Sequence, residues 1–157
     1  MGVLSNIDVY WAIAEEAHAN MQTAWAEHVT PKPDGQPGYI IRWDPDRSSF
    51  KSAMIAIAFC GMFLDSLLYL SLQDRLGRVK ALRVDRLPHE KRLEALGIID
   101  SVLLDRMVAF RESRKDLVHE KAVELTDLTG QSIRTAQDTA DSAMSLMQDI
   151  RVLLVAP

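Results

Sequence analysis

The sequence predicts an all-α protein, folded as an up-and-down bundle of four to five helices. Apolar residues recur at spacings of three and four along most of the chain, and strand-like alternation is nearly absent. Four of the six prolines fall between positions 31 and 45, which predicts one long Pro/Gly-rich loop over about 30–47. No comparable loop follows, so we expect residues 1–157 to form a single domain.

Capping residues and apolar stripes set the expected elements. Ser48 or Ser49 can cap the second helix, Pro88 suits a first helical turn, and Gly97 suits a helix end. The first helix carries two histidines, His18 and His28, on its apolar stripe, where we expect them to be hydrogen-bonded at the edge of the core. The expected segments are helices over about 6–28, 48–75, 88–97, 98–114 and from about 132 onward, with a short strand or packing arm over 39–43.

The most apolar stretch, 53–72, has the length of a membrane span but contains Asp65. An isolated carboxylate in lipid is costly, so we interpret the stretch as a helix buried inside a bundle or a dimer. Within that helix we expect Asp65 either to pair with a cation, for which an arginine such as Arg114 is the economical partner, or to be capped or exposed at the helix edge. We expect neither a membrane span nor a membrane partner.

Composition and charge restrict the class of protein. The chain is 48% hydrophobic with a single cysteine, Cys60, so packing alone must hold the fold, and we expect a small buried core residue there. The first residues lack the basic start and apolar core of a signal peptide, which with the lone cysteine predicts a cytoplasmic protein. A net charge of −4 argues against broad coating of nucleic acid.

One segment reverses that charge. Residues 75–92 hold seven basic groups against two acidic ones, so a polyanion would be met near this stretch. If the partner is RNA, the cations expected to position it are Arg78, Lys80, Arg83 and Arg86.

The sequence lacks the motifs of several common enzyme and metal-binding classes. The chain has no Gly-x-Ser-x-Gly elbow, no phosphate-binding Gly-rich loop and no zinc-spaced Cys or His pairs. A di-iron bundle would need two Glu-x-x-His motifs, whereas the chain has one, ending at His18, and an Asp-x-x-His over 116–119. A metal-binding bundle therefore stays only a second alternative, and we expect no cofactor.

The segment 110–119, Phe-Arg-Glu-Ser-Arg-Lys-Asp-Leu-Val-His, follows the amphipathic helix and contains Arg114, four residues, then His119. Here the chain resembles the HEPN superfamily (higher eukaryotes and prokaryotes nucleotide-binding), whose hallmark is Arg-x(4–6)-His near a late helix of an all-α bundle. The two aliphatic residues before the histidine are similar to the residue types that the family usually carries at those positions. Family nucleases commonly carry Asn, Asp or His directly after the arginine, whereas this chain has Lys115.

The resemblance implies a homodimer in which two copies of the motif face one cleft and cleave single-stranded RNA without metal. Histidine suits proton transfer near neutral pH, and arginine can hold two phosphate oxygens. It also implies a toxin or defence effector held in check by an antitoxin partner. The alternative is a non-catalytic interaction or nucleotide-binding module, which Lys115 favours.

Helix geometry constrains this site. Positions five apart on a continuous α-helix lie about 140° apart around the axis, so Arg114 and His119 share a face only if the helix breaks or the cleft spans two chains. His119 instead aligns with Lys115 and Asp116, and Asp116 is a candidate to orient the imidazole.

Overall fold

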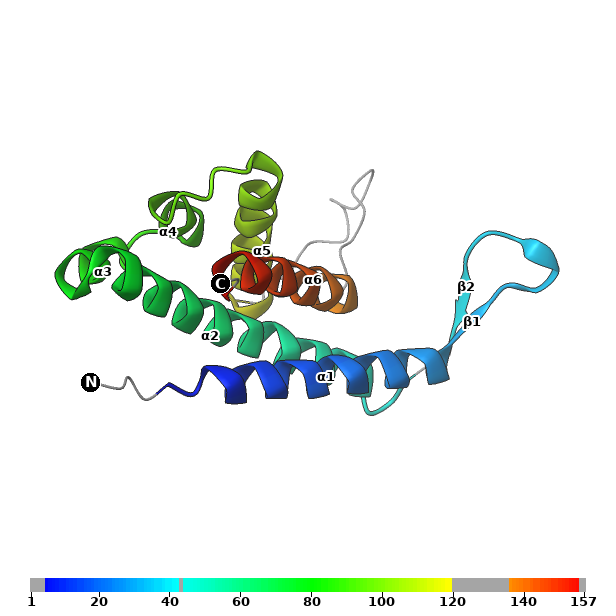
Figure 1. Cartoon of the computed structure of the whole chain (residues 1–157). Helices are drawn as coiled ribbons and strands as arrows, with labels where there is room; N and C mark the ends of the chain where they lie inside the picture. Colours follow the sequence, from blue (N-terminus) through cyan, green and yellow to red (C-terminus); the bar gives the residue numbers. More distant parts are fainter. Residues whose placement is uncertain (1–4, 43, 120–135, 156–157) are drawn as a thin grey trace.

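The structure is a computed structural model that describes residues 5–42, 44–119 and 136–155. Its described part is mostly helical, which confirms the predicted all-α class, and its one sheet has two short strands (Figure 1). The elements are α1 (Ile7–His28), β1 (Val29–Pro31), the 3₁₀ turn η1 (Pro33–Gly35), β2 (Tyr39–Ile41), α2 (Ser48–Leu76), α3 (Arg78–Val84), α4 (His89–Ala95), α5 (Ser101–His119) and α6 (Ala136–Val155).

Helix α2 is the centre of the molecule and contacts every other helix of the described part. It is apolar on nearly all sides because its neighbours cover several of its faces, and Leu64, Leu68 and Leu72 are fully buried. By length and hydropathy it also qualifies as a membrane span, but half of its most apolar window is buried within the protein. This burial agrees with the predicted core helix.

Helices α1 and α2 lie side by side and antiparallel, in the most extensive helix contact of the described chain (Figure 1). Small residues such as Ala14 and Ala53, both fully buried, let the two backbones approach closely. Trp11 then packs on Phe63 with ring centroids 4.9 Å apart. Helix α5, in contrast, runs across α2 in Figure 1, and the up-and-down order of all the long helices stays a prediction.

The predicted long loop is a β-hairpin arm that projects from the helices (Figure 1). Val29 pairs with Ile41 and Pro31 with Tyr39 in antiparallel register. The strand expected over 39–43 is confirmed for Tyr39–Ile41, while Trp43 lies outside the described residues. Tyr39 and Ile41 remain about two-thirds exposed, so the arm has no core of its own.

One helix was not predicted from the sequence, and another has different boundaries from those predicted. The segment after α2 turns at Gly77, whose φ of +76° suits glycine, and forms the unpredicted helix α3. The helix expected over 98–114 begins instead at Ser101, where the Asp100 carboxylate accepts a hydrogen bond from the Leu103 amide at 2.8 Å, and continues to His119. The motif therefore lies within α5 rather than after it. The beginning of the last predicted helix, 132–135, lies outside the described residues.

Candidate functional site

Arg114 extends from α5 onto the surface of α2. Its guanidinium lies against Gly61, where an added Cβ would approach the Arg114 Cζ to 2.5 Å. Gly61 is buried in the middle of a long helix, a position where glycine costs about 1 kcal/mol relative to alanine. A side chain at this position would have to displace the Arg114 guanidinium. Arg114 itself is half-buried.

Asp65, one turn beyond Gly61 on α2, is the centre of a charged cluster. Its Oδ1 accepts hydrogen bonds from His89 Nε2 at 2.8 Å and from Arg92 Nη1 at 3.1 Å, both on α4. Partial burial by itself would raise the pKa of Asp65. The hydrogen bond from His89 and the charges of His89, Arg92 and Arg114 outweigh the burial and lower that pKa below its usual value.

These contacts correct two sequence predictions. Within the described part, Asp65 forms its ion pairs with His89 and Arg92, whereas Arg114 lies close enough to affect its pKa but forms no ion pair with it. The position of His89 directly after the helix-starting Pro88 predicts a surface residue, but His89 is only 8% exposed. The reason is tertiary: the chain reverses after α2, and the first turn of α4 packs back on the middle of α2.

The charged cluster around Asp65 extends to Asp85 and to the contact between α4 and α5. Arg92 also bridges Asp85 at 3.1 Å, and Arg111 on α5 pairs with Glu90 at 3.2 Å. His89 Nδ1 and Glu90 Oε2 are buried with no hydrogen-bond partner in the described part of the chain. Because the free ring nitrogen of His89 is shielded from solvent, the imidazole cannot reach a substrate in this conformation. It anchors α4 to α2.

The two motif residues do not share a face. Since α5 is continuous through His119, the helix does not break between Arg114 and His119, and about 140° separates their positions around the axis. The side chain of His119 lies outside the described part, while Lys115 and Asp116, which precede it on the same side of the helix, are exposed. One chain therefore turns Arg114 toward α2, with Leu117 packed against the core beside it, and leaves Lys115 and Asp116 exposed on a different face.

The predicted RNA-contacting cations gather elsewhere. Arg78, Lys80, Arg83 and Arg86 are all exposed on or just after α3. Fifteen positions of α2 separate Gly61 from Leu76, the last residue of the helix before Arg78, which corresponds to about 22 Å. Arg86, in contrast, directly follows Asp85, which shares Arg92 Nη1 with Asp65. Among the described residues, no ion pair joins the four cations to the Asp65 cluster.

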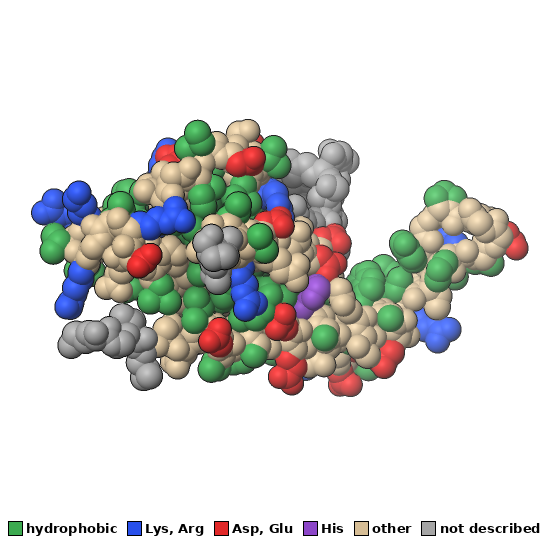
Figure 2. Space-filling model, in the orientation of Figure 1, with side chains coloured by type: hydrophobic (Ala, Val, Ile, Leu, Met, Phe, Trp, Pro, Cys, Tyr) green, Lys and Arg blue, Asp and Glu red, His purple; other side chains and the backbone are tan. Residues whose placement is uncertain are grey.

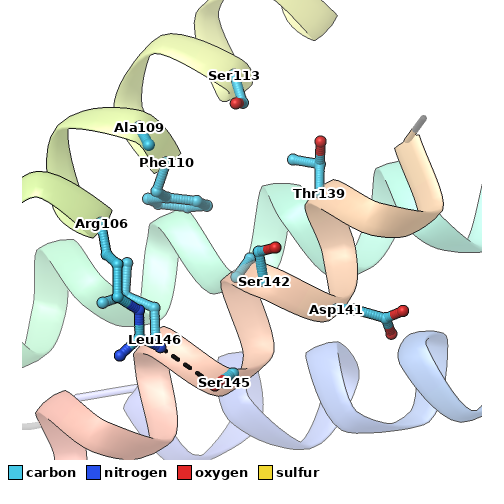
Figure 3. A pocket seen from close by; sticks show the side chains of 10 residues that line it. Arg106, Ala109, Phe110, Ser113, Thr139, Asp141, Ser142, Ser145 and Leu146 are labelled. Carbon is cyan, nitrogen blue, oxygen red and sulfur yellow. Dashed lines mark hydrogen bonds between the residues drawn. The ribbon is translucent and has the colours of Figure 1, made fainter. Parts of the chain in front are cut away.

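A cavity that the sequence did not predict lies between α5 and α6 (Figure 3). It measures about 570 Å³. Ser113 and Thr139 extend toward each other across it, and Arg106 closes one end with hydrogen bonds to Ser145 Oγ at 3.1 Å and Asp149 at 2.6 Å. No motif signals this cavity, because its hydroxyl groups come from two helices and have no distinctive spacing.

The remaining candidates are structural. His18 pairs with Asp141 at 2.6 Å, and His28 Nδ1 lies 2.9 Å from the Ala24 carbonyl, as expected of histidines at the core edge. Burial raises the pKa of Cys60 to about 12, which confirms a core thiol. Residues 5–42, 44–119 and 136–155 contain no group of three or more His, Cys, Asp or Glu side chains arranged to hold a metal ion.

Comparisons with models of protein families, with curated proteins and with solved structures found no match. The functional argument therefore depends on the residues of this chain.

Proposed function

We propose that this protein is a HEPN-like, metal-independent endoribonuclease that acts as a homodimer, with an up-and-down bundle as its frame. The proposal depends on Arg114, whose half-buried guanidinium lies against Gly61 and close enough to Asp65 to lower the pKa of that carboxyl. Partial burial restricts the side chain, and a restricted arginine loses less entropy on binding phosphate than a fully exposed one. The sequence pattern of residues 114–119 and the mostly helical fold also support the proposal.

The continuity of α5 favours a site shared between two chains. Arg114 and His119 lie on different sides of one helix, so a cleft that uses both takes the arginine from one copy and the histidine from the other. A two-fold axis would supply the reciprocal pair, as in any isologous dimer.

The chemistry follows from the two side chains. Cleavage of RNA by its own 2′-hydroxyl requires removal of the hydroxyl proton, protonation of the leaving 5′-oxygen and stabilisation of the charge on phosphorus. His119 transfers the protons and Arg114 binds two phosphate oxygens in a planar fork. Asp116 orients the imidazole, and Lys115 adds a positive charge beside the phosphate. Any contact between RNA and the cations of α3 would lie outside the pair of Arg114 and His119.

The test is cleavage of single-stranded RNA by the purified chain in excess EDTA, with analysis of the product ends. We expect a 2′,3′-cyclic phosphate, and a loss of at least about a hundredfold in rate for Arg114→Ala or His119→Ala. His28→Ala and Arg47→Ala are matched controls, because both lie outside the motif. Cleavage that survives both motif substitutions refutes the assignment.

A mixing experiment tests the shared site. Arg114→Ala and His119→Ala chains, each inactive alone, are co-expressed with different tags and purified as heterodimers. Such a dimer contains one arginine and one histidine on opposite chains, so we expect partial recovery of cleavage. No recovery in a verified heterodimer contradicts a site shared in this way.

A non-catalytic interaction or nucleotide-binding module is the second candidate. It is favoured by Lys115, which cannot accept a hydrogen bond when charged, and by the partial burial of Arg114. Wild-type protein that binds RNA or nucleotides without cleaving them would support it. Elemental analysis of the purified protein tests the metal-binding alternative.

The biological role also stays a proposal: a cytoplasmic toxin or defence effector that an antitoxin neutralises. Growth arrest on expression, absent in His119→Ala, tests the toxic effect. Rescue by co-expression of a neighbouring gene product would identify the antitoxin.

A further inference from the structure

Helix α3 has an unusual surface for a helix of a compact protein. Only Ala81 is fully buried, against α2, while Val79 is 69% exposed and Leu82 48% exposed. Leu87, just after the helix, is 44% exposed. The side chains between and beside these aliphatic residues are the exposed cations Arg78, Lys80, Arg83 and Arg86.

The position of α3 makes this surface accessible. Helix α3 forms one end of the molecule, and in Figure 2 cationic and hydrophobic side chains gather on that projecting end. Among the described residues, no ion pair joins its four cations to a carboxylate. Their charge is therefore available to a partner.

We propose that the α3 end, defined as residues 78–87, docks peripherally on an anionic lipid surface. Aliphatic side chains that are flanked by cations suit the boundary between lipid headgroups and acyl chains. Val79, Leu82 and Leu87 insert shallowly, while the long arginine and lysine side chains reach the phosphates and carboxylates of the headgroups.

Lipid explains this surface better than the other polyanions do. RNA phosphates would use the four cations, but exposed aliphatic side chains offer no planar surface on which bases stack. To bind a helix of another protein, this surface would need an apolar groove. The α3 end instead projects outward (Figure 2). A membrane is broad and accepts a projecting surface.

The charge distribution favours one orientation. The chain has a net charge of −4, yet residues 78–87 hold four basic groups against one acidic group, Asp85, which pairs with Arg92. An anionic surface therefore attracts this end and repels the rest. This docking departs from the expectation of no membrane partner, which was drawn from the carboxylate in the candidate span, because docking from the surface requires no spanning helix. The inference is also independent of RNA cleavage.

The experiment is co-sedimentation of the full chain with vesicles of phosphatidylcholine alone or mixed with phosphatidylserine. We expect binding only to the mixed vesicles, weakened by salt because screening shortens the reach of the charges. Each cation of α3 changed to glutamine should weaken binding about fivefold. The paired control, Arg42→Gln with Lys51→Gln, removes two charges from exposed positions elsewhere, one more than each single variant, and should leave binding unchanged.

A second set of variants tests the exposed aliphatic side chains of the α3 end. Val79→Ser with Leu82→Ser should weaken vesicle binding severalfold, whereas Ile99→Ser with Val102→Ser, a control pair at least as exposed, should not. Because Cys60, the one cysteine of the chain, is buried, Val79→Cys creates a single reactive thiol for an environment-sensitive dye. A blue shift on mixed vesicles, absent for Ile99→Cys, would place the α3 end in the lipid boundary.

Three results would overturn the inference. The first is no binding to the mixed vesicles, and the second is equal binding to vesicles of both compositions. The third is vesicle binding that survives both the charge and the aliphatic substitutions in α3. If the charge variants lose single-stranded RNA binding while no vesicle binds, the surface belongs to nucleic acid instead.

Discussion

Two arginine-rich regions of this molecule, the Asp65 cluster and the α3 end, look alike in sequence but differ in the folded protein. In the cluster, Arg92 is 14% exposed and bound to two carboxylates, and Arg114 packs on Gly61. In the α3 end, Arg78 and Arg83 are exposed, and no described carboxylate forms an ion pair with them. The same residue type therefore fixes the position of a helix in one region and remains available for binding in the other.

The comparison also shows why local charge is a poor guide to a binding site. Residues 75–92 contain both Arg83 and Arg92, yet only the second meets a carboxylate from α2. Partial burial makes the paired arginine costly to remove, because the carboxylates left behind lose their partner. An exposed arginine is hydrated before and after folding, so its removal affects stability little.

The largest predicted effect concerns Gly61→Ala. The added methyl group displaces the Arg114 guanidinium, so we expect RNA cleavage to fall about a hundredfold, as misplacement by about 1 Å can cause. The free energy of unfolding should change by less than about 1 kcal/mol, because the better helix propensity of alanine offsets the displaced contact. Cleavage assays and urea unfolding measure the two effects.

The Arg114→Ala background provides the control for that variant. With no guanidinium to displace, Gly61→Ala should stabilise the helix by up to about 1 kcal/mol. A destabilising effect in both backgrounds would contradict the contact between these residues.

The second effect concerns Arg92→Ala. It removes the shared partner of Asp65 and Asp85 and the hydrogen bond from Arg92 Nε to the Leu87 carbonyl at 2.7 Å, so we expect a loss of about 1–3 kcal/mol. Urea denaturation measures it. Lys91→Ala is the matched control, since its pair with Glu94 is largely exposed and solvent screening leaves such a pair with little effect on stability. Equal losses would contradict a special role for the cluster.

The third effect is a pH dependence. Because the pKa of Asp65 is lowered in the folded protein, its contribution to stability is present above the ordinary value of 3.8 and is lost as the pH falls through the folded pKa. The side chain is 45% exposed, so solvent screening limits the contribution to less than about 1 kcal/mol.

Asp65→Asn should therefore be less stable than the wild type at neutral pH and should converge with it in acid. Urea titrations at several pH values measure this, with the exposed Glu16→Gln as control. A constant difference between wild type and variant at every pH would contradict the assignment.

The smallest effect is expected for Arg83→Ala, which should change the free energy of unfolding by no more than about 0.5 kcal/mol. The same substitution should still weaken binding to anionic vesicles, so stability and binding separate at this position. A loss above about 1 kcal/mol in urea denaturation would show that Arg83 has a packing role, and the contrast between the two regions would fail.

Periodicity predicted most of the helices well, since stripes such as the one that contains Ala14 and Met21 of α1 report directly which side is buried. It missed α3, whose two turns are too short to establish a period and whose exposed face mixes apolar and basic residues. It also ended the helix of the motif at Arg114, because the polar residues that follow do not extend the apolar stripe.

The features of the candidate site also separate into those that the sequence predicts and those that it does not. The sequence alone determined a mostly helical chain, the buried character of α2 with one carboxylate in its apolar stretch 53–72, and the local motif from Arg114 to His119. Only the tertiary structure decided that Asp65 pairs with His89 and Arg92, that Gly61 makes room for Arg114, and that the cations of α3 stay exposed. Burial and helix period depend on neighbours along the chain and can be predicted from local spacing. The partner of a charge depends on how α4 folds back on α2, a contact across 24 residues that no local pattern encodes.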